Sequence, residues 1–268
     1  MSRKVWIYLL FWLSFLASPG QAATSVVGEQ VPLVDEVDYF SLASDTVRVE
    51  GLMGDSGAYP WLRNKQAIIN FGYTPFIYWL RIPLVNPSDE VVDRLLVLSY
   101  PLLDNVDLYL TLNGRIVHQY HVGDNYPYEQ RSIKNRLFVV PFEFQAHSDY
   151  MLYVHARSVS SMQLPMTLWE THAFYSENSV KILGFGFFFG ALLIIAGYNF
   201  FLWFSVRDAN YLYYVAFVLS FCGLVATLEG IGFQFLWGHH IWWNDHSVVF
   251  FGCSTLAFAS VFARGFLQ

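Results

Sequence analysis

The feature that most constrains this chain is a long run near its middle that lacks any charged side chain. Residues 182 to 206 read ILGFGFFFGALLIIAGYNFFLWFSV. About 20 apolar residues are enough for a helix to cross the hydrocarbon core of a bilayer. Two more uncharged runs follow, at residues 211–228 and 247–263. We therefore predict three transmembrane helices, at about residues 182–206, 211–236 and 247–267.

The composition agrees with a chain that is only partly embedded in a membrane. Hydrophobic residues make up 55% of the chain and charged residues 13%, against about 45–50% and 25% in soluble domains. Because the uncharged runs all lie in the last third, the apolar excess is local. We predict a membrane region at residues 179–268 and a soluble domain before it.

The N-terminus indicates where that soluble domain lies. MSRKVWIYLLFWLSFLASPGQA has a basic start at Arg3 and Lys4, a short apolar core, and small residues at Gly20 and Ala22. This order is typical of a cleaved secretory signal peptide, here residues 1–22. A retained anchor helix is the alternative, although the apolar core is short for a membrane span. Residues 23–178 would then be exported to the periplasm.

Export fixes the orientation of the membrane helices. The first helix would run from outside to inside, which places the charged pair Arg207-Asp208 in a cytoplasmic turn where water and headgroups solvate it. Arg264 would also be cytoplasmic, and both arginines agree with the positive-inside tendency. We expect a multi-pass protein of the bacterial inner membrane, in contact with its lipid, with an N-terminal periplasmic domain.

The exported segment has the alternation of β-strands. FIYWLRIPLV places Tyr78, Leu80 and Ile82 on one face and Trp79 and Arg81 on the other. VDLYLTLNGRIVHQYHV is two alternating runs joined by Asn-Gly, the pair that a type I′ hairpin favours. RLFVVPFEF, DYMLYVHARS and MQLPMTLWET add further short strands. The spacing predicts an all-β antiparallel sandwich.

Cysteines and charge limit the partners. Both cysteines, Cys222 and Cys253, fall in predicted membrane helices, so the exported domain must be held together by its core without disulfides. A domain of about 150 residues can achieve this. The net charge is −6 and no basic run is present, which argues against nucleic acid as a partner.

Several motifs occur in an order that resembles a known family. They are NFGYTPFIYWLRIPLVNPS, YPLLDNVDLYL, HVGDNYP, QLPMTLWETHAF and YNFFLWFSVRDANYLYYVAFVLS. Together they resemble the bacterial seven-transmembrane receptors with diverse intracellular signalling modules. The resemblance extends over about residues 30 to 268. It implies that the soluble part is the second type of extracellular domain, a jelly-roll sandwich related in shape to carbohydrate-binding modules.

The resemblance also implies a function. Such receptors have seven helices followed by a cytoplasmic output module, commonly a diguanylate cyclase or a histidine kinase. Since the sequence stops after its third predicted helix, we expect it to be a fragment of a longer receptor, with a sensor that lacks its own output as the alternative. The oligomeric state stays open, a homodimer included.

Candidate ligand-binding residues are aromatic, basic or acidic side chains of the exported strands and turns. Aromatic rings on a sandwich face can stack on sugars, an arginine can clamp a carboxylate or phosphate, and carboxylates in turns can ligate Ca²⁺. Core packing, structural ion pairs and ordinary turn chemistry are the competing interpretations. The six candidates are Trp79, Arg81, Tyr109, Arg131, Asp104 and Asp124. A glycan-like or small anionic ligand is preferred over a metal, and no cofactor is expected.

No catalytic constellation is recognisable, because no nucleophile elbow, phosphate loop or paired-carboxylate pattern occurs. Three hypotheses remain. The chain is a transmembrane sensor, a membrane-anchored binding or scaffold module, or a transporter component. Transport would need charges near the bilayer midplane, whereas Glu229 lies near the outer end of the second predicted helix. There it should face the bundle or water, in a structural or a signalling role. A sensor is the preferred interpretation.

Overall fold

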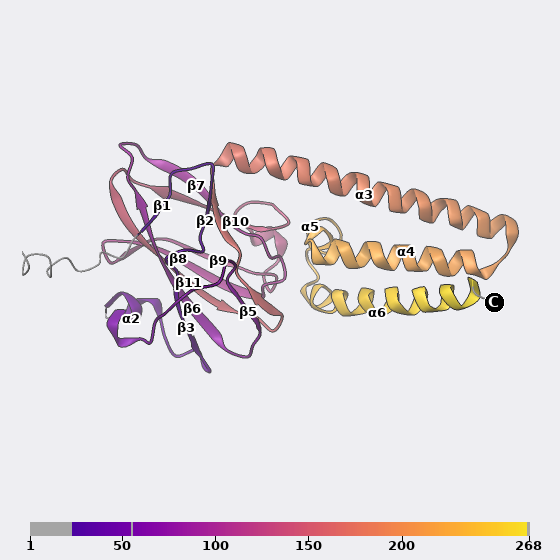
Figure 1. The fold of residues 1–268 in the computed structure, drawn as a ribbon, viewed down its shortest axis with the longest axis horizontal. Helices are drawn as coiled ribbons and strands as arrows, with labels where there is room; N and C mark the ends of the chain where they lie inside the picture. The colour runs from indigo at the N-terminus through magenta and orange to yellow at the C-terminus, as the bar shows by residue number, and fades with distance from the viewer. Residues whose placement is uncertain (1–22, 55, 267–268) are drawn as a thin grey trace, which may run out of the picture.

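The computed structural model describes residues 23–54 and 56–266, so the predicted signal peptide lies outside the described residues. A β-sandwich forms the N-terminal part, and a group of long helices extends from one end of it (Figure 1). The larger sheet has the strand order β4-β3-β6-β11-β8-β9, with β1 pairing parallel to β6. A four-stranded sheet has the order β10-β7-β13-β2, and β12 and β5 form a small ribbon.

The strands have the following bounds: β1 Thr24–Ser25, β2 Gln30–Pro32, β3 Asp38–Leu42, β4 Leu62–Arg63, β5 Asn70–Tyr73, β6 Ile77–Asn86, β7 Val92–Leu98, β8 Asn105–Leu112, β9 Arg115–Val122, β10 Phe138–Phe144, β11 Ser148–Arg157, β12 Ser161–Gln163 and β13 Met166–Trp169. A short helix, α2 (Val49–Gly54), follows β3, and two 3₁₀ turns occupy Ser56–Ala58 and Tyr128–Gln130. Apart from β1, the pairing is antiparallel, as the sequence predicts.

The hairpin between β8 and β9 turns on Asn113 and Gly114, whose φ angles are +52° and +70°. Two consecutive positive φ values define the type I′ turn that Asn-Gly favours. This part of the sequence-based prediction is confirmed.

The main core lies between the two larger sheets. From β6 it takes Leu80, Ile82 and Leu84, and from β7 it takes Leu96 and Leu98, all fully buried. Each such side chain contributes about 1.5–3 kcal/mol relative to an exposed one. The alternation in β6 therefore places Leu80 and Ile82 inward, as predicted.

The other face of β6 is also covered, which simple alternation did not predict. Residues 43–54, which include α2, and 56–61 fold across it and form a second cluster around Phe40, Leu52 and Trp79. Trp79 is only 2% exposed for this reason. The outer face of the larger sheet is thus partly covered, and a groove lies between the covering segment and the strands.

Three helices are long and apolar enough to cross a membrane: α3 (Thr171–Val206), α4 (Ala209–Leu228) and α6 (Ile241–Phe266). A short helix, α5 (Ile231–Phe235), joins the last two. The boundaries differ from the sequence-based ones in three places. Helix α3 begins eleven residues before 182, directly after β13. Helix α4 ends at Leu228, short of 236, because Gly230 takes a left-handed conformation, φ +71°. Helix α6 begins at Ile241, six residues before 247.

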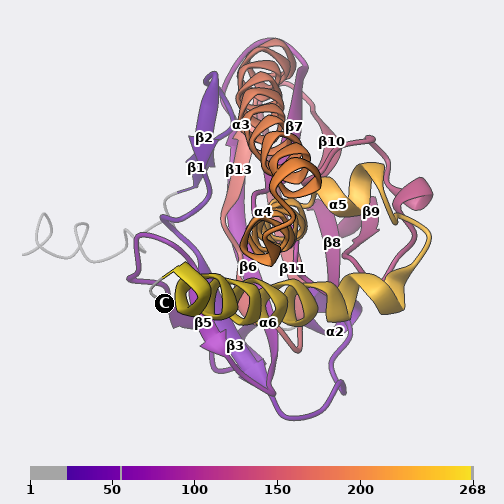
Figure 2. The same cartoon turned by 90° about the vertical axis from the view of Figure 1, so that its right-hand side faces the viewer.

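The charged pair Arg207-Asp208 has a specific role in the turn between α3 and α4. Arg207 takes a left-handed conformation (φ +65°) and caps the C-terminus of α3, while the Asp208 side chain accepts a hydrogen bond from the Asn210 backbone N–H and caps α4. The C-terminus of α3 and the N-terminus of α4 are therefore both capped by residues of the turn itself. Helix α4 lies between α3 and α6 (Figure 2).

Candidate functional site: an outer groove and a membrane-facing joint

The six candidate residues separate into two groups at different places on the sandwich. Trp79, Arg81 and Tyr109 lie on the outer face of the larger sheet. Asp104, Asp124 and Arg131 lie in loops. Asp124 contacts α6 and Arg131 contacts α5, and Asp104 is hydrogen-bonded to the loop that carries Asp124. We call the first place the outer groove and the second the joint.

The outer groove has a volume of about 410 Å³. Its lining residues come from the segment that covers the sheet and from the strands beneath: Asp45, Thr46, Val47, Arg48, Val49, Glu50, Trp79, Asp107, Tyr109, Gln119 and His155. The Trp79 ring lies 6.1 Å from that of Tyr109 and 4.6 Å from that of His155, measured between centroids. Two of the six candidates thus line one cavity together.

Asp107 organises the polar side of the groove. Its carboxylate lies 2.6 Å from Nδ1 of His121 and 3.0 Å from Nδ1 of His155. Burial would raise the pKa of Asp107, but these two hydrogen bonds outweigh it and hold the pKa below its usual range. Asp107 is therefore an ionised group at neutral pH.

The pKa of Tyr109 is raised in the same groove. Burial, followed by the carboxylates of Asp107, Glu50 and Asp45, raises the pKa of Tyr109 to about 12. Its hydroxyl group stays protonated and can donate a hydrogen bond.

The positive charge of Arg81 is paired with the carboxylate of Asp38. Its Nε and Nη2 atoms donate to Oδ2 of Asp38 at 3.1 and 2.9 Å, and its guanidinium lies 4.5 Å from the centre of the Trp61 ring. Asp38 also pairs with Arg63 at 2.7 Å. Arg81 belongs to a structural charge network on the outer face, next to the groove and outside its lining.

At the joint, Asp104 and Asp124 come together through the loop that follows β9. The Asp104 carboxylate accepts from the Val159 backbone N–H at 2.5 Å, and its carbonyl accepts from the Asn125 N–H. Gly123 has φ +146°, and a Cβ there would lie 2.0 Å from the Asp104 carbonyl oxygen. Only glycine permits this close approach.

Asp124 connects the sandwich to α6. Its Oδ2 accepts from Nδ2 of Asn244 at 3.2 Å, while Oδ1 has no hydrogen-bond partner among the described residues. Asn244 in turn accepts from Nε1 of Trp237 at 3.1 Å. Because Asp124 is buried, and because the carboxylates of Asp104 and Asp245 lie nearby, its pKa rises to about 8. A protonated carboxyl group therefore occupies this contact at neutral pH.

Arg131 holds the loop that leads into β10. Its Nη1 donates to the carbonyl oxygens of Asn135 and Arg136 at 2.6 and 3.1 Å. Its guanidinium lies 4.6 Å from the Phe138 ring and 5.2 Å from the Phe233 ring of α5. Burial lowers its pKa to about 10, so the group stays charged. Arg131 links the loop to α5 through these contacts.

Sequence reasoning missed Arg136, which contacts two membrane helices at once. Its Nη1 donates to Oε2 and to the backbone carbonyl of Glu229, at 3.0 and 3.1 Å, at the end of α4. Its guanidinium also lies 5.1 Å from the Phe185 ring of α3. The signal that pointed here was Glu229, a charge near the end of a span that needs a partner. Its partner lies 93 residues away in the sequence.

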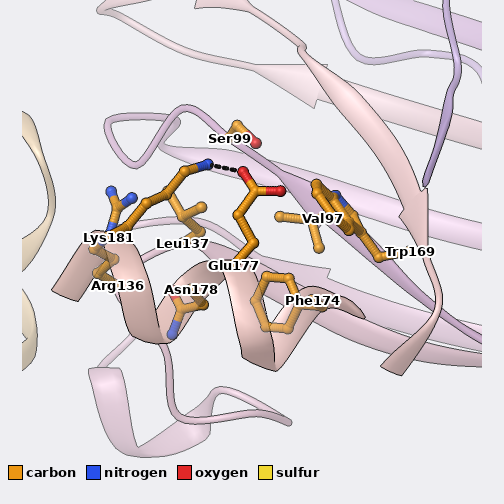
Figure 3. A pocket seen from close by; sticks show the side chains of 9 residues that line it. All are labelled: Val97, Ser99, Arg136, Leu137, Trp169, Phe174, Glu177, Asn178 and Lys181. Carbon is orange, nitrogen blue, oxygen red and sulfur yellow. Dashed lines mark ion pairs between the residues drawn. The ribbon is translucent and has the colours of Figure 1, made fainter. Parts of the chain in front are cut away.

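Helix α3 is anchored on the smaller sheet. Phe174 packs against Trp169 and against Val97, Leu137 and Val139 in a buried cluster, shown in part in Figure 3. One turn later Glu177 pairs with Lys181 at 2.6 Å along the helix surface. The first turns of α3 are thus part of the sandwich, while its later turns are the membrane span.

With this architecture, the chain can be compared with known proteins. Residues 35–170 match the family model of 7TMR-DISM extracellular domain 2, and residues 181–268 match that of the 7TM region with diverse intracellular signalling. The chain belongs to this family of seven-transmembrane receptors. It is a membrane protein whose N-terminal domain is of an extracellular, sensory type.

No curated protein matches the chain. A solved structure, the GH31 alpha-xylosidase from Xanthomonas citri, is 8% identical with a TM-score of 0.27, and the match covers 50% of this chain and 13% of that one. A TM-score this low does not establish a shared fold.

Proposed function

We propose that the chain is the sensory part of a receptor in the bacterial inner membrane, in which a ligand in the outer groove changes the position of the membrane helices. The output would be a cytoplasmic module such as a diguanylate cyclase or a histidine kinase, as the family resemblance implies. The observation that carries the proposal is Arg136, a sandwich residue that contacts α3 and α4 together.

Further contacts at the joint support mechanical coupling. Asp124 and Asn244 are both almost fully buried where they meet, and the Tyr128 backbone N–H donates to the Gly238 carbonyl. The pair Glu129–His239 at 3.1 Å is exposed and adds little. A domain attached by one flexible linker would not need buried polar contacts with other helices. A change in the sandwich therefore has a route into α3, α4 and α6.

The groove suits a polyhydroxylated ligand better than an anion. The two arginines that suggested an anion are engaged elsewhere, Arg81 with Asp38 and Arg131 with backbone carbonyls. Trp79 and Tyr109 line the groove, together with Gln119, His155 and Asp107 as hydrogen-bonding groups. Aromatic rings beside several polar groups are typical of sites for sugar rings.

A ligand drives a receptor only through different affinities for two states, typically worth 1–3 kcal/mol. The test is hydrogen exchange on the chain in lipid nanodiscs, with a panel of neutral, anionic and cationic saccharides. A binding compound should protect residues 45–50 and 107–109 and also change exchange at residues 229–246. The double variant Arg136→Met/Glu229→Gln should keep the first effect and lose the second.

Two results would count against the sensor. Protection restricted to the groove in the unmodified chain would favour the anchored scaffold module. Protection at residues 229–246 that persists in the double variant would show that Arg136 does not carry the coupling.

A further inference from the structure

The polar residues of the outer groove carry an excess of negative charge. Asp45, Glu50 and Asp107 line it, and the permanently charged base among its lining residues is Arg48. Arg48 is exposed. Besides burial, these three carboxylates raise the pKa of Tyr109, which lines the same groove. Such a field attracts a positive group.

His155 lines the groove, and one of its two ring nitrogens has no hydrogen-bond partner among the described residues. Its Nδ1 faces Oδ2 of Asp107 at 3.0 Å, which requires a proton on Nδ1. In the neutral ring Nε2 is then an acceptor, and it lies 3.3 Å from Oδ1 of Asp45, which is also an acceptor. Nε2 is buried without a hydrogen-bond partner among the described residues. When the ring is neutral, two acceptors therefore face each other, and a ligand group that donates a proton to both would satisfy them.

Beside His155, Trp79 has an N–H group that needs an acceptor. The indole is 98% buried, and its Nε1–H has no hydrogen-bond partner in the described part of the chain. A hydroxyl or ring oxygen of a ligand would supply an acceptor. The rings of Trp79, Tyr109 and His155 lie together in the same wall, and aromatic faces attract cations.

We propose that the ligand of the outer groove is an amino sugar with a free, protonated amine. Its ammonium group donates to the carboxylates of Asp45 and Asp107 and to Nε2 of His155, while its hydroxyl oxygens meet Trp79 and Tyr109. This inference rests on the groove being the ligand site of the proposed sensor, and it replaces a general glycan with a cationic one.

The test uses two β-1,4-linked trimers that differ in one substituent per ring. Cellotriose carries a hydroxyl group at C2, and the glucosamine trimer carries an ammonium group there. We expect the full chain in nanodiscs to bind the glucosamine trimer at least tenfold more tightly by titration calorimetry at low salt. The N-acetylated trimer, which has lost the charge, should behave like cellotriose.

Substitution of the carboxylates locates the effect. Asp45→Asn and Glu50→Gln change exposed residues and should each reduce the preference for the glucosamine trimer several-fold. Asp89→Asn is the matched control, because Asp89 is an exposed carboxylate in the β6–β7 turn that pairs with His147. It should keep the full preference. Loss of the preference in all three variants would indicate general charge attraction and overturn the inference.

The remaining outcomes are also decisive. Equal binding of all trimers would overturn the amino-sugar inference and leave the groove as a glycan site. Binding of none would overturn it as well. In either case the exchange experiment with the broader panel still decides whether the chain is a sensor.

Discussion

At the scale of single residues, the joint depends on side chains that are buried between the sandwich and the helices. Asp124 is the most unusual, since its protonated form is stabilised in the docked structure. Its pKa is about 8, against about 3.9 in an unfolded chain. A raised pKa means that the contribution of Asp124 to folding and docking is complete below about pH 4. It is lost as pH rises through about 8.

We therefore expect the joint to loosen progressively between about pH 4 and about pH 8 and to change little above that. Hydrogen exchange at residues 229–246, corrected for the intrinsic effect of pH, should increase over this range. Asp124→Asn should remove the increase, because an amide does not ionise and can still accept from Asn244. Asp89→Asn should leave it unchanged. An Asp124→Asn variant with the original pH dependence would exclude Asp124 as its source.

Gly230 permits a second test, with a control of the same conformation. It has φ +71°, and a Cβ there would lie 2.7 Å from the Arg136 carbonyl and 2.8 Å from Pro101. Gly114 has φ +70° but nothing within 4 Å of its Cβ position. Both Gly→Ala variants incur the strain of positive φ, about 1–3 kcal/mol.

Only Gly230→Ala should also separate α4 from the sandwich. We expect it to lower the thermal unfolding temperature more than Gly114→Ala and to increase exchange at residues 229–246. Equal effects of the two variants on that segment would mean that the close approach at Gly230 does not hold the joint.

At the scale of elements, the anchoring of α3 is the contact that most directly connects the sandwich with the membrane. Phe174 is 4% exposed in a cluster with Trp169, so Phe174→Ala should cost about 3–5 kcal/mol of that packing. We expect faster exchange at residues 171–178 and easier proteolysis there. Phe187→Ala, on the exposed side of α3, is the control and should change neither. An unchanged exchange rate in Phe174→Ala would contradict the anchoring.

The elements themselves were largely predictable from the sequence. Alternation gave β6, β8 and β11, and Asn-Gly gave the hairpin, because both signals are local. The start of α3 was placed too late, since THAFYSENSVK is polar enough to suggest a connection between domains. It is helical because Phe174 is buried against the sheet. Tertiary packing, which the local sequence does not encode, decided this boundary.

The candidate site was only partly predictable, for the same reason. Aromatic residues of a strand suggested a binding face, and Trp79 and Tyr109 do line the groove. Its acidic side was missed because Asp45 and Glu50 come from the segment that covers the sheet, which has no strand pattern. Arg136 was missed because nothing near it in the sequence indicates contact with α3 and α4.

At the scale of the whole molecule, the orientation of the helices in the membrane is open to a direct test. If the sandwich is exported, the turn at Arg207-Asp208 is cytoplasmic. An alkaline phosphatase fused after residue 175 should be active, and one fused after residue 207 should be inactive. The reverse pattern would refute the orientation, whatever the ligand.

The unbroken course of α3 has a geometric consequence. A helix of 36 residues is about 54 Å long, and one end of it is clamped to the sandwich by Phe174. It therefore acts as a lever whose fulcrum lies at this clamp. A tilt of only about 5° at the clamp would displace the far end of such a helix by about 5 Å. Since Arg207 and Asp208 close a tight turn there, α4 would be pulled along with it.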